Sequence, residues 1–317
     1  MCIRDSVYIV GQPGLIYHYD GTSWTRQDAG TQVPLTDVWG DGPGNVYVTG
    51  HGGTILRSSG DGGWSRMESG TTANLFDVGI YQGDIMAVGR DGAMRVLSGS
   101  TWSAAPNEVY IRDAQQTVVD TFYTDDDEDE NYIESFPSLC YYGVTGADGA
   151  ILMDDPETAW QLRRVTGGVE WVTCAAGDDD RISGNFIATD GGRLFQLSFS
   201  DVDGLSWNER YSPALEATVY GIYVDQADTV WAVTNDGRIN RVDPDNSFHE
   251  LYEDGLILFD IWGTSGTNLY AVGIEGRVIH FHEINPGEYG WELEELPDLP
   301  EAKSYAAVYD KFGVLVQ

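Results

Sequence analysis

Basic residues and long hydrophobic runs are scarce in this sequence, and both absences exclude functions. The 317 residues include 17 Lys and Arg against 51 Asp and Glu, and the formal net charge is −34 at pH 7. Because nucleic-acid binding needs basic side chains that displace counterions from phosphates, we exclude it. No stretch approaches the roughly 18 consecutive apolar residues of a membrane span. The acidity instead fits an extracytoplasmic surface, a bound cation or a basic partner.

Cysteine and helical periodicity are also scarce. The three cysteines form no Cys-x-x-Cys, and no His pair has zinc spacing, which argues against a disulfide-rich scaffold or a structural zinc site. We expect Cys140 and Cys174 to be buried thiols, with a disulfide between neighbouring repeats as the alternative. No window sustains apolar residues at the i, i+3, i+4, i+7 spacing of an amphipathic helix, so we expect few helices.

The first residues look foreign to the rest of the chain. Met1–Asp5 resembles the translation of a transposase end sequence used in preparing DNA libraries, and we expect residues 1–6 to be a non-native leader. Val7–Gly11 already reads as the middle of a repeat. We therefore expect a truncated, metagenomic-type fragment with a single domain over residues 7–317.

Glycine and aromatic residues are abundant, and both recur at regular positions. There are 39 Gly, 10 Trp and 18 Tyr residues, which favours tight turns between short aromatic-rich strands. Three kinds of short run, β-branched or aromatic and bounded by Gly, Asn or Asp, predict such strands. Their copies are Leu35–Gly40, Leu75–Val78 and Leu258–Gly263; Asn45–Gly50, Asp84–Gly89 and Asn268–Gly273; and Gly53–Leu56, Gly92–Met94, Gly149–Leu152, Gly192–Phe195, Gly237–Ile239 and Gly276–Ile279.

The glycine that opens the third run marks each copy. These glycines fall at residues 14, 53, 92, 149, 192, 237 and 276, and three of the six intervals are 39 residues. We expect them to supply positive φ angles in hairpin turns. One aromatic residue follows in each copy, and we expect it to fill the space between neighbouring sheets. These residues are Trp24, Trp64, Trp102, Trp160, Trp207, Phe248 and Trp291.

The repeat predicts an all-β fold, a seven-bladed β-propeller whose blades are four-stranded antiparallel sheets. We expect residues 304–309 to return beside the N-terminal strands as the innermost strand of their blade, which closes the ring. An eighth blade or an open-ended fragment is the alternative, because residues 313–317 read like another second strand. In the third blade we interpret Val118–Phe122 as the first strand, with an insertion after it.

The copies resemble the bacterial propeller repeats of the YVTN, Asp-box and photosystem II assembly-factor-like group. The segments that carry the resemblance are Asp37–Gly40, Val46–Gly50 and Gly52–Leu56. The Ser-x-Asp-x-Gly-x-x-Trp pattern of the Asp box is only approached, because Asp20–Trp24 and Asp203–Trp207 carry the Asp one position late. The resemblance implies an extracytoplasmic propeller that serves as a binding or assembly module.

Acidic residues gather in two predicted loops. Loops that join the first and second strands of propeller blades emerge on one face, so we expect these residues to form a shared acidic face. The residues are Asp125, Asp127 and Asp129 in the third blade and Asp178 and Asp180 in the fourth. Several carboxylates suit Ca²⁺ or a basic partner, whereas the lack of calcium-loop spacing favours a solvated loop. We expect no other cofactor.

The opposite face should carry the turns between second and third strands, above which many propellers bind ligands. The candidate ligand- or partner-binding residues there are His51, Arg90, Asp148, Asp190 and Asp236. The alternative is that they serve turn geometry, as Asp and Asn before Gly commonly do.

Acidic residues also recur on the predicted innermost strand, where we favour a structural hydrogen bond made once per blade. These residues are Asp37, Asp77, Asp120 and Asp260.

No catalytic constellation stands out. The sequence has no Ser-x-x-Lys, no Gly-x-Ser-x-Gly and no His-Glu-x-x-His, and its carboxylates are too numerous to single out an acid/base pair. His280-x-His282 alternates onto one face of a strand, where packing is favoured over metal ligation. We therefore expect a non-catalytic module, monomeric by default, that binds protein or glycan. A glycan-active hydrolase of propeller fold and a structural repeat segment of a larger surface protein are the alternatives.

Overall fold

In the computed structural model, the elements formed by the described residues are all β-strands, which confirms the all-β class. The residues that the structure describes are 6–40, 42, 44–81, 84–90, 93–104, 139–140, 143–145, 150–153, 161–164, 172–176, 185–189, 192–200, 204–211, 217–298 and 304–310. Within these ranges there is no helix that has the length and apolar character to cross a membrane.

Within the described residues the strands form seven four-stranded sheets, and the pairs inside each sheet are antiparallel. Sheet 1 contains β28 (Ser304–Asp310), β1 (Val7–Gln12), β2 (Leu15–Tyr19) and β3 (Trp24–Asp28); sheet 2 contains β4 (Leu35–Gly40), β5 (Val46–Gly50), β6 (Thr54–Ser58) and β7 (Trp64–Met67); sheet 3 contains β8 (Leu75–Tyr81), β9 (Asp84–Gly89), β10 (Met94–Ser98) and β11 (Thr101–Ala104).

The other four sheets follow in chain order. Sheet 4 contains β12 (Leu139–Cys140), β13 (Gly143–Thr145), β14 (Ala150–Met153) and β15 (Gln161–Arg164); sheet 5 contains β16 (Val172–Ala176), β17 (Asn185–Thr189), β18 (Leu194–Ser200) and β19 (Gly204–Tyr211); sheet 6 contains β20 (Val219–Val224), β21 (Val230–Thr234), β22 (Arg238–Val242) and β23 (Phe248–Glu253); sheet 7 contains β24 (Leu258–Ser265), β25 (Asn268–Gly273), β26 (Val278–Asn285) and β27 (Glu288–Leu293).

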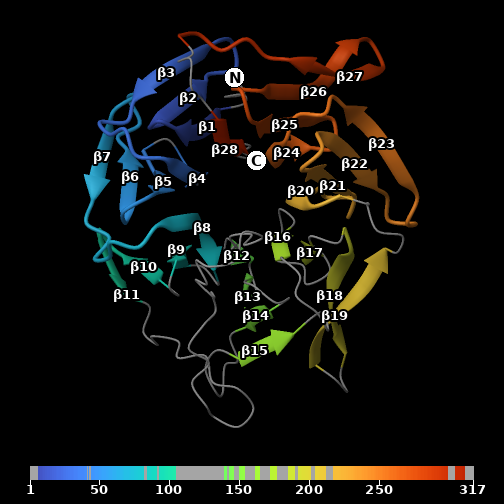
Figure 1. Ribbon diagram of the computed structural model, residues 1–317, viewed down its shortest axis with the longest axis horizontal. Helices are drawn as coiled ribbons and strands as arrows, with labels where there is room; N and C mark the ends of the chain where they lie inside the picture. Colours follow the sequence, from blue (N-terminus) through green and yellow to red (C-terminus); the bar gives the residue numbers. More distant parts are fainter. Residues whose placement is uncertain are drawn as a thin grey trace, which may run out of the picture.

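The sheets are arranged in a ring around a common axis (Figure 1). The first strand of each sheet is innermost, and successive first strands contact one another in the order β28, β4, β8, β12, β16, β20 and β24. The last of these, β24, contacts β28 again, so the series returns to its start. A ring of this kind leaves none of the inner strands as a free edge of the structure.

The chain ends of the described part meet in sheet 1. Strand β28 pairs antiparallel with β1, with Tyr8 opposite Tyr309 and Ile9 opposite Val308. The predicted return of residues 304–309 as the innermost strand beside the N-terminal strands is therefore confirmed. Sheet 1 is built from both ends of the described chain, and this pairing is what joins sheet 7 to sheet 2 around the ring.

The hydrophobic core lies between neighbouring sheets, because each strand of a buried sheet has two apolar faces. Strand β1 shows this alternation: Val7 and Ile9 belong to the cluster shared with sheet 7. Tyr8 and Val10 belong to the cluster shared with sheet 2. Equivalent clusters lie between sheets 2 and 3, 5 and 6, and 6 and 7.

The recurring aromatic residue of the outer strand packs against the sheet before it. Trp102 of sheet 3 is 4% exposed and meets Tyr47 of sheet 2 edge-on, with ring centroids 6.0 Å apart. Three equivalent pairs, Trp24 with Tyr270, Trp64 with Tyr8, and Trp291 with Trp231, have separations of 6.1, 5.9 and 6.5 Å. The predicted role is confirmed at these positions.

The other three of the seven aromatic positions do not show this packing. One is exposed, and the side chains of two lie outside the described part. Phe248 is 38% exposed, so it does not fill the space between sheets. Trp160 and the side chain of Trp207 lie outside what the structure describes.

The glycines that mark each copy adopt the predicted positive φ. The angles at Gly14, Gly53, Gly192, Gly237 and Gly276 are 58°, 67°, 73°, 82° and 71°. At Gly53 a Cβ atom would lie 1.9 Å from the carbonyl oxygen of Thr71, so close backbone approach adds to the need for glycine. Gly92 and Gly149 lie outside the described residues.

The predicted first strand of the third complete copy is wrong. Sheet 4 begins with β12 at Leu139–Cys140, not with Val118–Phe122, which lies outside the described residues. The long insertion therefore precedes the first strand of that sheet instead of following it. A two-residue strand offers no periodicity to detect, whereas the β-branched run at Val118–Phe122 matches the strand pattern well.

The two internal cysteines lie on innermost strands of neighbouring sheets. Cys140 belongs to β12 and Cys174 to β16, two strands that contact one another. Their side chains fall outside the description, so the expected buried thiols stay a prediction.

Candidate partner-binding face

Three of the five candidate binding residues lie in the turns between second and third strands. His51 joins β5 to β6, Arg90 joins β9 to β10, and Asp236 joins β21 to β22. Because every sheet repeats the same strand order around the ring, these turns emerge on one face of the molecule, which we call the loop face. The other two candidates, Asp148 and Asp190, lie outside the described residues.

A repeated backbone hydrogen bond fixes these turns. The residue just after the second strand donates its N–H to a carbonyl just before the first strand of the same sheet. The pairs are His51 to Pro34 at 3.0 Å, Arg90 to Asn74 at 2.7 Å, Asn235 to Thr218 at 3.0 Å and Ile274 to Ile257 at 3.1 Å. Three of these four second strands end in glycine, and at Gly89 a Cβ atom would lie 2.2 Å from the Asn74 carbonyl oxygen.

Asn74 brings the turns of sheets 2 and 3 together. The Gly52 N–H donates to the Asn74 side-chain oxygen at 3.0 Å, and the Arg90 N–H donates to the Asn74 carbonyl. The turns that carry His51 and Arg90, both half-buried residues, therefore meet at Asn74. Burial, followed by the positive charge of Arg90, lowers the pKa of His51. At neutral pH the pair offers a guanidinium beside a neutral imidazole, a set that can donate to and accept from a partner.

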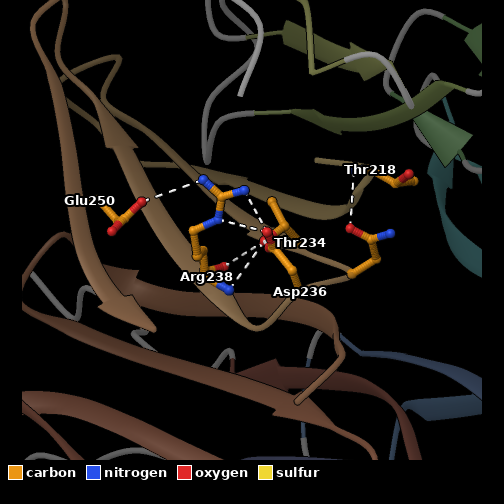
Figure 2. Close-up of polar contacts among 6 residues, drawn as sticks. Thr218, Thr234, Asp236, Arg238 and Glu250 are labelled. Atoms are coloured by element: carbon orange, nitrogen blue, oxygen red, sulfur yellow. Dashed lines mark hydrogen bonds and ion pairs between the residues drawn. The ribbon is translucent and has the colours of Figure 1, made fainter. Parts of the chain in front are cut away.

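Asp236 is held by its own turn (Figure 2). Its carboxylate accepts hydrogen bonds from Arg238 Nε at 2.8 Å and from Thr234 Oγ1 at 2.5 Å, and Arg238 also reaches Glu250 at 3.4 Å. Burial opposes ionisation of Asp236, but the bonds from Arg238 and Thr234 outweigh it and lower the pKa of that carboxyl. These contacts match the turn-geometry alternative better than a free binding group.

The recurring acids of the innermost strands meet near the ring axis. Asp37 Oδ2 accepts a hydrogen bond at 2.8 Å from the N–H of Val78 in the next sheet, and its carboxyl also bonds to Asp77. Burial first, then the charge of Asp77, raises the pKa of Asp37 well above its usual value. Asp260 accepts instead from the N–H of its own neighbour, Ile261, at 2.9 Å.

A repeated irregularity in the first strands accompanies these acids. The register against the second strand shifts at Leu35/Asp37, Leu75/Asp77, Val219/Gly221 and Leu258/Asp260. Such bulges re-aim side chains. The favoured structural hydrogen bond is thus present at Asp37 and Asp260, but with different partners. Asp120 lies outside the described residues, and it is not on the first strand of sheet 4.

The strand positions agree with only part of the predicted acidic face. Asp125, Asp127 and Asp129 fall in the chain between β11 and β12, so they are not in a loop between first and second strands, as we expected. Asp178 and Asp180 do fall between β16 and β17. All five lie outside the described residues. Within the described part no group of three or more His, Cys, Asp or Glu side chains is placed to hold a metal ion. Calcium binding stays a prediction.

The histidine pair of β26 makes packing contacts, as favoured. The His280 ring stacks on Tyr270 at 3.9 Å and on His282 at 4.4 Å. Its Nδ1 lies 3.0 Å from Glu294 Oε1, a contact that is the main cause of a lowered Glu294 pKa.

Sequence reasoning missed Asn74 and Arg238. Arg238 had a signal, because Arg193, Arg238 and Arg277 all follow the glycine that marks a copy. No sequence pattern pointed to Asn74, because its role depends on two hydrogen bonds that join the turns of different sheets.

The closed ring of four-stranded antiparallel sheets, with a core between sheets, defines a β-propeller. No protein-family model matches the chain. Among curated proteins, the immune protein Tsi7 of Pseudomonas aeruginosa is 27% identical over 133 residues, a match that covers 35% of this chain and 44% of that protein. The match thus spans less than half the length of that relative.

Solved structures similar to this chain are β-propellers at low sequence identity. YCF48 from Cyanidioschyzon merolae is 19% identical with a TM-score of 0.64, over 88% of this chain and 91% of that one. A structure of YCF48 bound to D1 peptide is 15% identical with a TM-score of 0.52, over 82% of this chain and 80% of that one. Streptogramin B lyase is 14% identical with a TM-score of 0.56, over 93% of this chain and 96% of that one. At these identities the similarity shows the fold alone.

Proposed function

We propose that this chain is a non-catalytic interaction module that binds a protein partner through the loop face, in an extracytoplasmic setting. The observation that carries the proposal is that the turns carrying His51 and Arg90 meet at Asn74, with the Arg90 charge close enough to lower the pKa of His51. The two residues come from neighbouring sheets, and backbone hydrogen bonds fix the turn that carries each of them. A guanidinium donates in a planar fork that suits a carboxylate or main-chain carbonyl of a partner.

Two comparisons support a protein partner. A propeller similar to this chain, YCF48, has been solved bound to D1 peptide. The curated relative carries the name of an immune protein, which suits recognition of another macromolecule. Glycan binding, the other expectation from the sequence, has no comparable support.

A catalytic propeller is the second candidate, because streptogramin B lyase is among the similar structures. Its test is direct: incubation of this protein with streptogramin B, followed by liquid chromatography and tandem mass spectrometry of the antibiotic. Under the proposed function the antibiotic stays intact, and its conversion would make the chain an enzyme.

The proposed function is tested by selection of peptides from a displayed library on the purified protein. The strongest binder is then titrated against the double variant His51→Glu and Arg90→Glu, which reverses the local charge. We expect its affinity to fall at least ~10-fold. Arg66→Glu, on the exposed face of β7, is the control and should bind like the unaltered protein. Equal binding by the loop-face variant would refute the assignment.

A further inference from the structure

Exposed hydrophobic side chains are concentrated on the outer strands of sheets 6 and 7. In the part of the chain whose side chains are described, the large apolar residues with substantial exposure are Phe248 at 38% and Leu251 at 37% on β23, Ile284 at 39% on β26, and Tyr289 at 44% and Leu293 at 62% on β27. Strands β23 and β27 both lie on the outer side of the ring (Figure 1). Tyr252 and Trp291 join them, with ring centroids 6.4 Å apart. We call this surface the outer rim.

Strand β27 has a two-sided character. Tyr289, Trp291 and Leu293 alternate along one side, and Trp291 packs on Phe281 at 4.9 Å in the cluster shared with sheet 6. Glu288 and Glu292 occupy the other side, where the Glu292 side chain is 60% exposed and bonds to His282. Because successive side chains of a strand point to opposite faces, one edge presents an apolar row and a carboxylate row together.

The charge of the rim restricts what it can bind. Strands β23 and β27 carry Glu250, Glu253, Glu288 and Glu292 and contain no Lys or Arg. A second copy of this chain would bring the same carboxylates and a net charge of −34. An anionic lipid surface would be repelled in the same way. A partner in which basic residues are interspersed among apolar ones can contact both the apolar row and the carboxylate row of β27.

The edge of β27 also offers backbone groups. It is the last strand of sheet 7, in the order β24, β25, β26, β27. An edge strand can accept an added strand from another chain through main-chain hydrogen bonds, and side-chain pairing then gives specificity.

We propose that the edge of β27 binds an extended segment of a partner protein in which basic and apolar residues alternate. The apolar residues of that segment cover Leu293 and Tyr289, and its basic residues pair with Glu288 and Glu292. This surface is separate from the loop face, so the inference goes beyond the function proposed above and stands without it.

The test uses three fluorescein-labelled octapeptides and fluorescence anisotropy. One alternates Lys and Val, one has the same composition in two blocks, and one alternates Glu and Val. We expect binding of the alternating Lys peptide, with affinity at least ~10-fold weaker for the other two, because only the first matches both rows of β27. Equal binding of the alternating and block peptides would reduce the rim to non-specific charge attraction and would overturn the proposal.

Variants locate the site. Leu293→Glu should weaken binding of the alternating Lys peptide at least ~10-fold. Glu288→Lys with Glu292→Lys should transfer the preference to the alternating Glu peptide. Leu251→Glu, an equally drastic change on β23, is the matched control and should bind as the unaltered protein does. Because these residues are exposed, unchanged thermal melting will show that each variant folds.

Three further outcomes contradict the proposal. They are unaltered binding by Leu293→Glu, loss of binding by Leu251→Glu to the same extent, and a dimer in sedimentation experiments that Leu293→Glu abolishes, which would make the occupant a second copy. The His51→Glu and Arg90→Glu variant should bind these octapeptides normally. This comparison distinguishes failure of the proposed β27 site from failure of the proposed loop-face site.

Discussion

At the scale of single residues, Asp37 and Asp77 are the least expected feature of the molecule. Two carboxyl groups from the innermost strands of neighbouring sheets bond to one another, and Asp37 also accepts from the Val78 N–H. Two carboxylates in contact cannot both ionise without a large electrostatic cost, so the pair favours holding a proton. The pair therefore ties sheet 2 to sheet 3 in a way that depends on pH.

The pH dependence of stability tests this pairing. Because the folded pKa of Asp37 is raised, its favourable contribution is present at pH values below the unfolded pKa and is lost as pH rises through the folded pKa. Asp37→Asn mimics the protonated acid, since its amide donates to Asp77 and its oxygen accepts from Val78. Urea unfolding at a series of pH values should show the free energy of unfolding falling less steeply with pH in Asp37→Asn than in the unaltered protein.

The control for that measurement is Asp84→Asn, a change at an exposed carboxylate on the neighbouring strand β9. It removes one carboxylate from sheet 3 and keeps the Asp37–Asp77 contact, so it is the comparison for the slope of Asp37→Asn. Parallel curves for the unaltered protein and Asp37→Asn would mean that Asp37 is ionised in the folded state, contrary to this account.

The repeat revealed that Asp recurs on the innermost strand, but it did not reveal what each Asp contacts. Asp37 bonds across to the next sheet, whereas Asp260 bonds to its own neighbour. In sheet 6 the same position is Gly221, where a Cβ would lie 2.9 Å from the Cα of Asp260. The same residue type at the same repeat position thus has different contacts, because the neighbouring residues belong to another copy of the repeat and differ from copy to copy.

At the scale of elements, glycine and aromatic spacing determined most of the strands correctly. The turn glycines need a positive φ and the outer-strand tryptophans need a slot between sheets, and both requirements leave a trace in the sequence. The first strand of sheet 4 left none, because β12 has only two residues. The outer rim also escaped detection, since the alternation in β27 looks like that of any outer strand and its exposure depends on its neighbours.

Packing between sheets makes a prediction about tryptophan. Trp102 is 4% exposed and contacts Tyr47 and Met67 of sheet 2, so Trp102→Ala should lower the free energy of unfolding by about 3–5 kcal/mol. Phe248 holds the same place in its copy but is 38% exposed, so Phe248→Ala should cost less than about 1 kcal/mol. Chemical denaturation of both variants measures the difference. Equal losses would show that the two aromatics are equally buried, against the structure.

At the scale of the whole molecule, seven marking glycines and an N-terminal segment that lacks a first strand were enough to predict a ring and its closure. What the sequence did not predict is which surfaces of the ring are used. On the loop face the turns that carry His51 and Arg90 meet at Asn74, and at the outer rim Tyr252 and Trp291 join sheets 6 and 7. Both depend on contacts between copies, which the pattern within one copy does not record.

The closure of the ring is the claim on which the rest depends, because the loop face and the outer rim take their geometry from it. Amide-to-amide NOEs in a perdeuterated sample test it most directly. We predict contacts between β1 and β28 in an antiparallel register that places Tyr8 opposite Tyr309 and Ile9 opposite Val308. Antiparallel pairing of β28 with any strand other than β1, or pairing of β1 with β2 alone, would contradict the account.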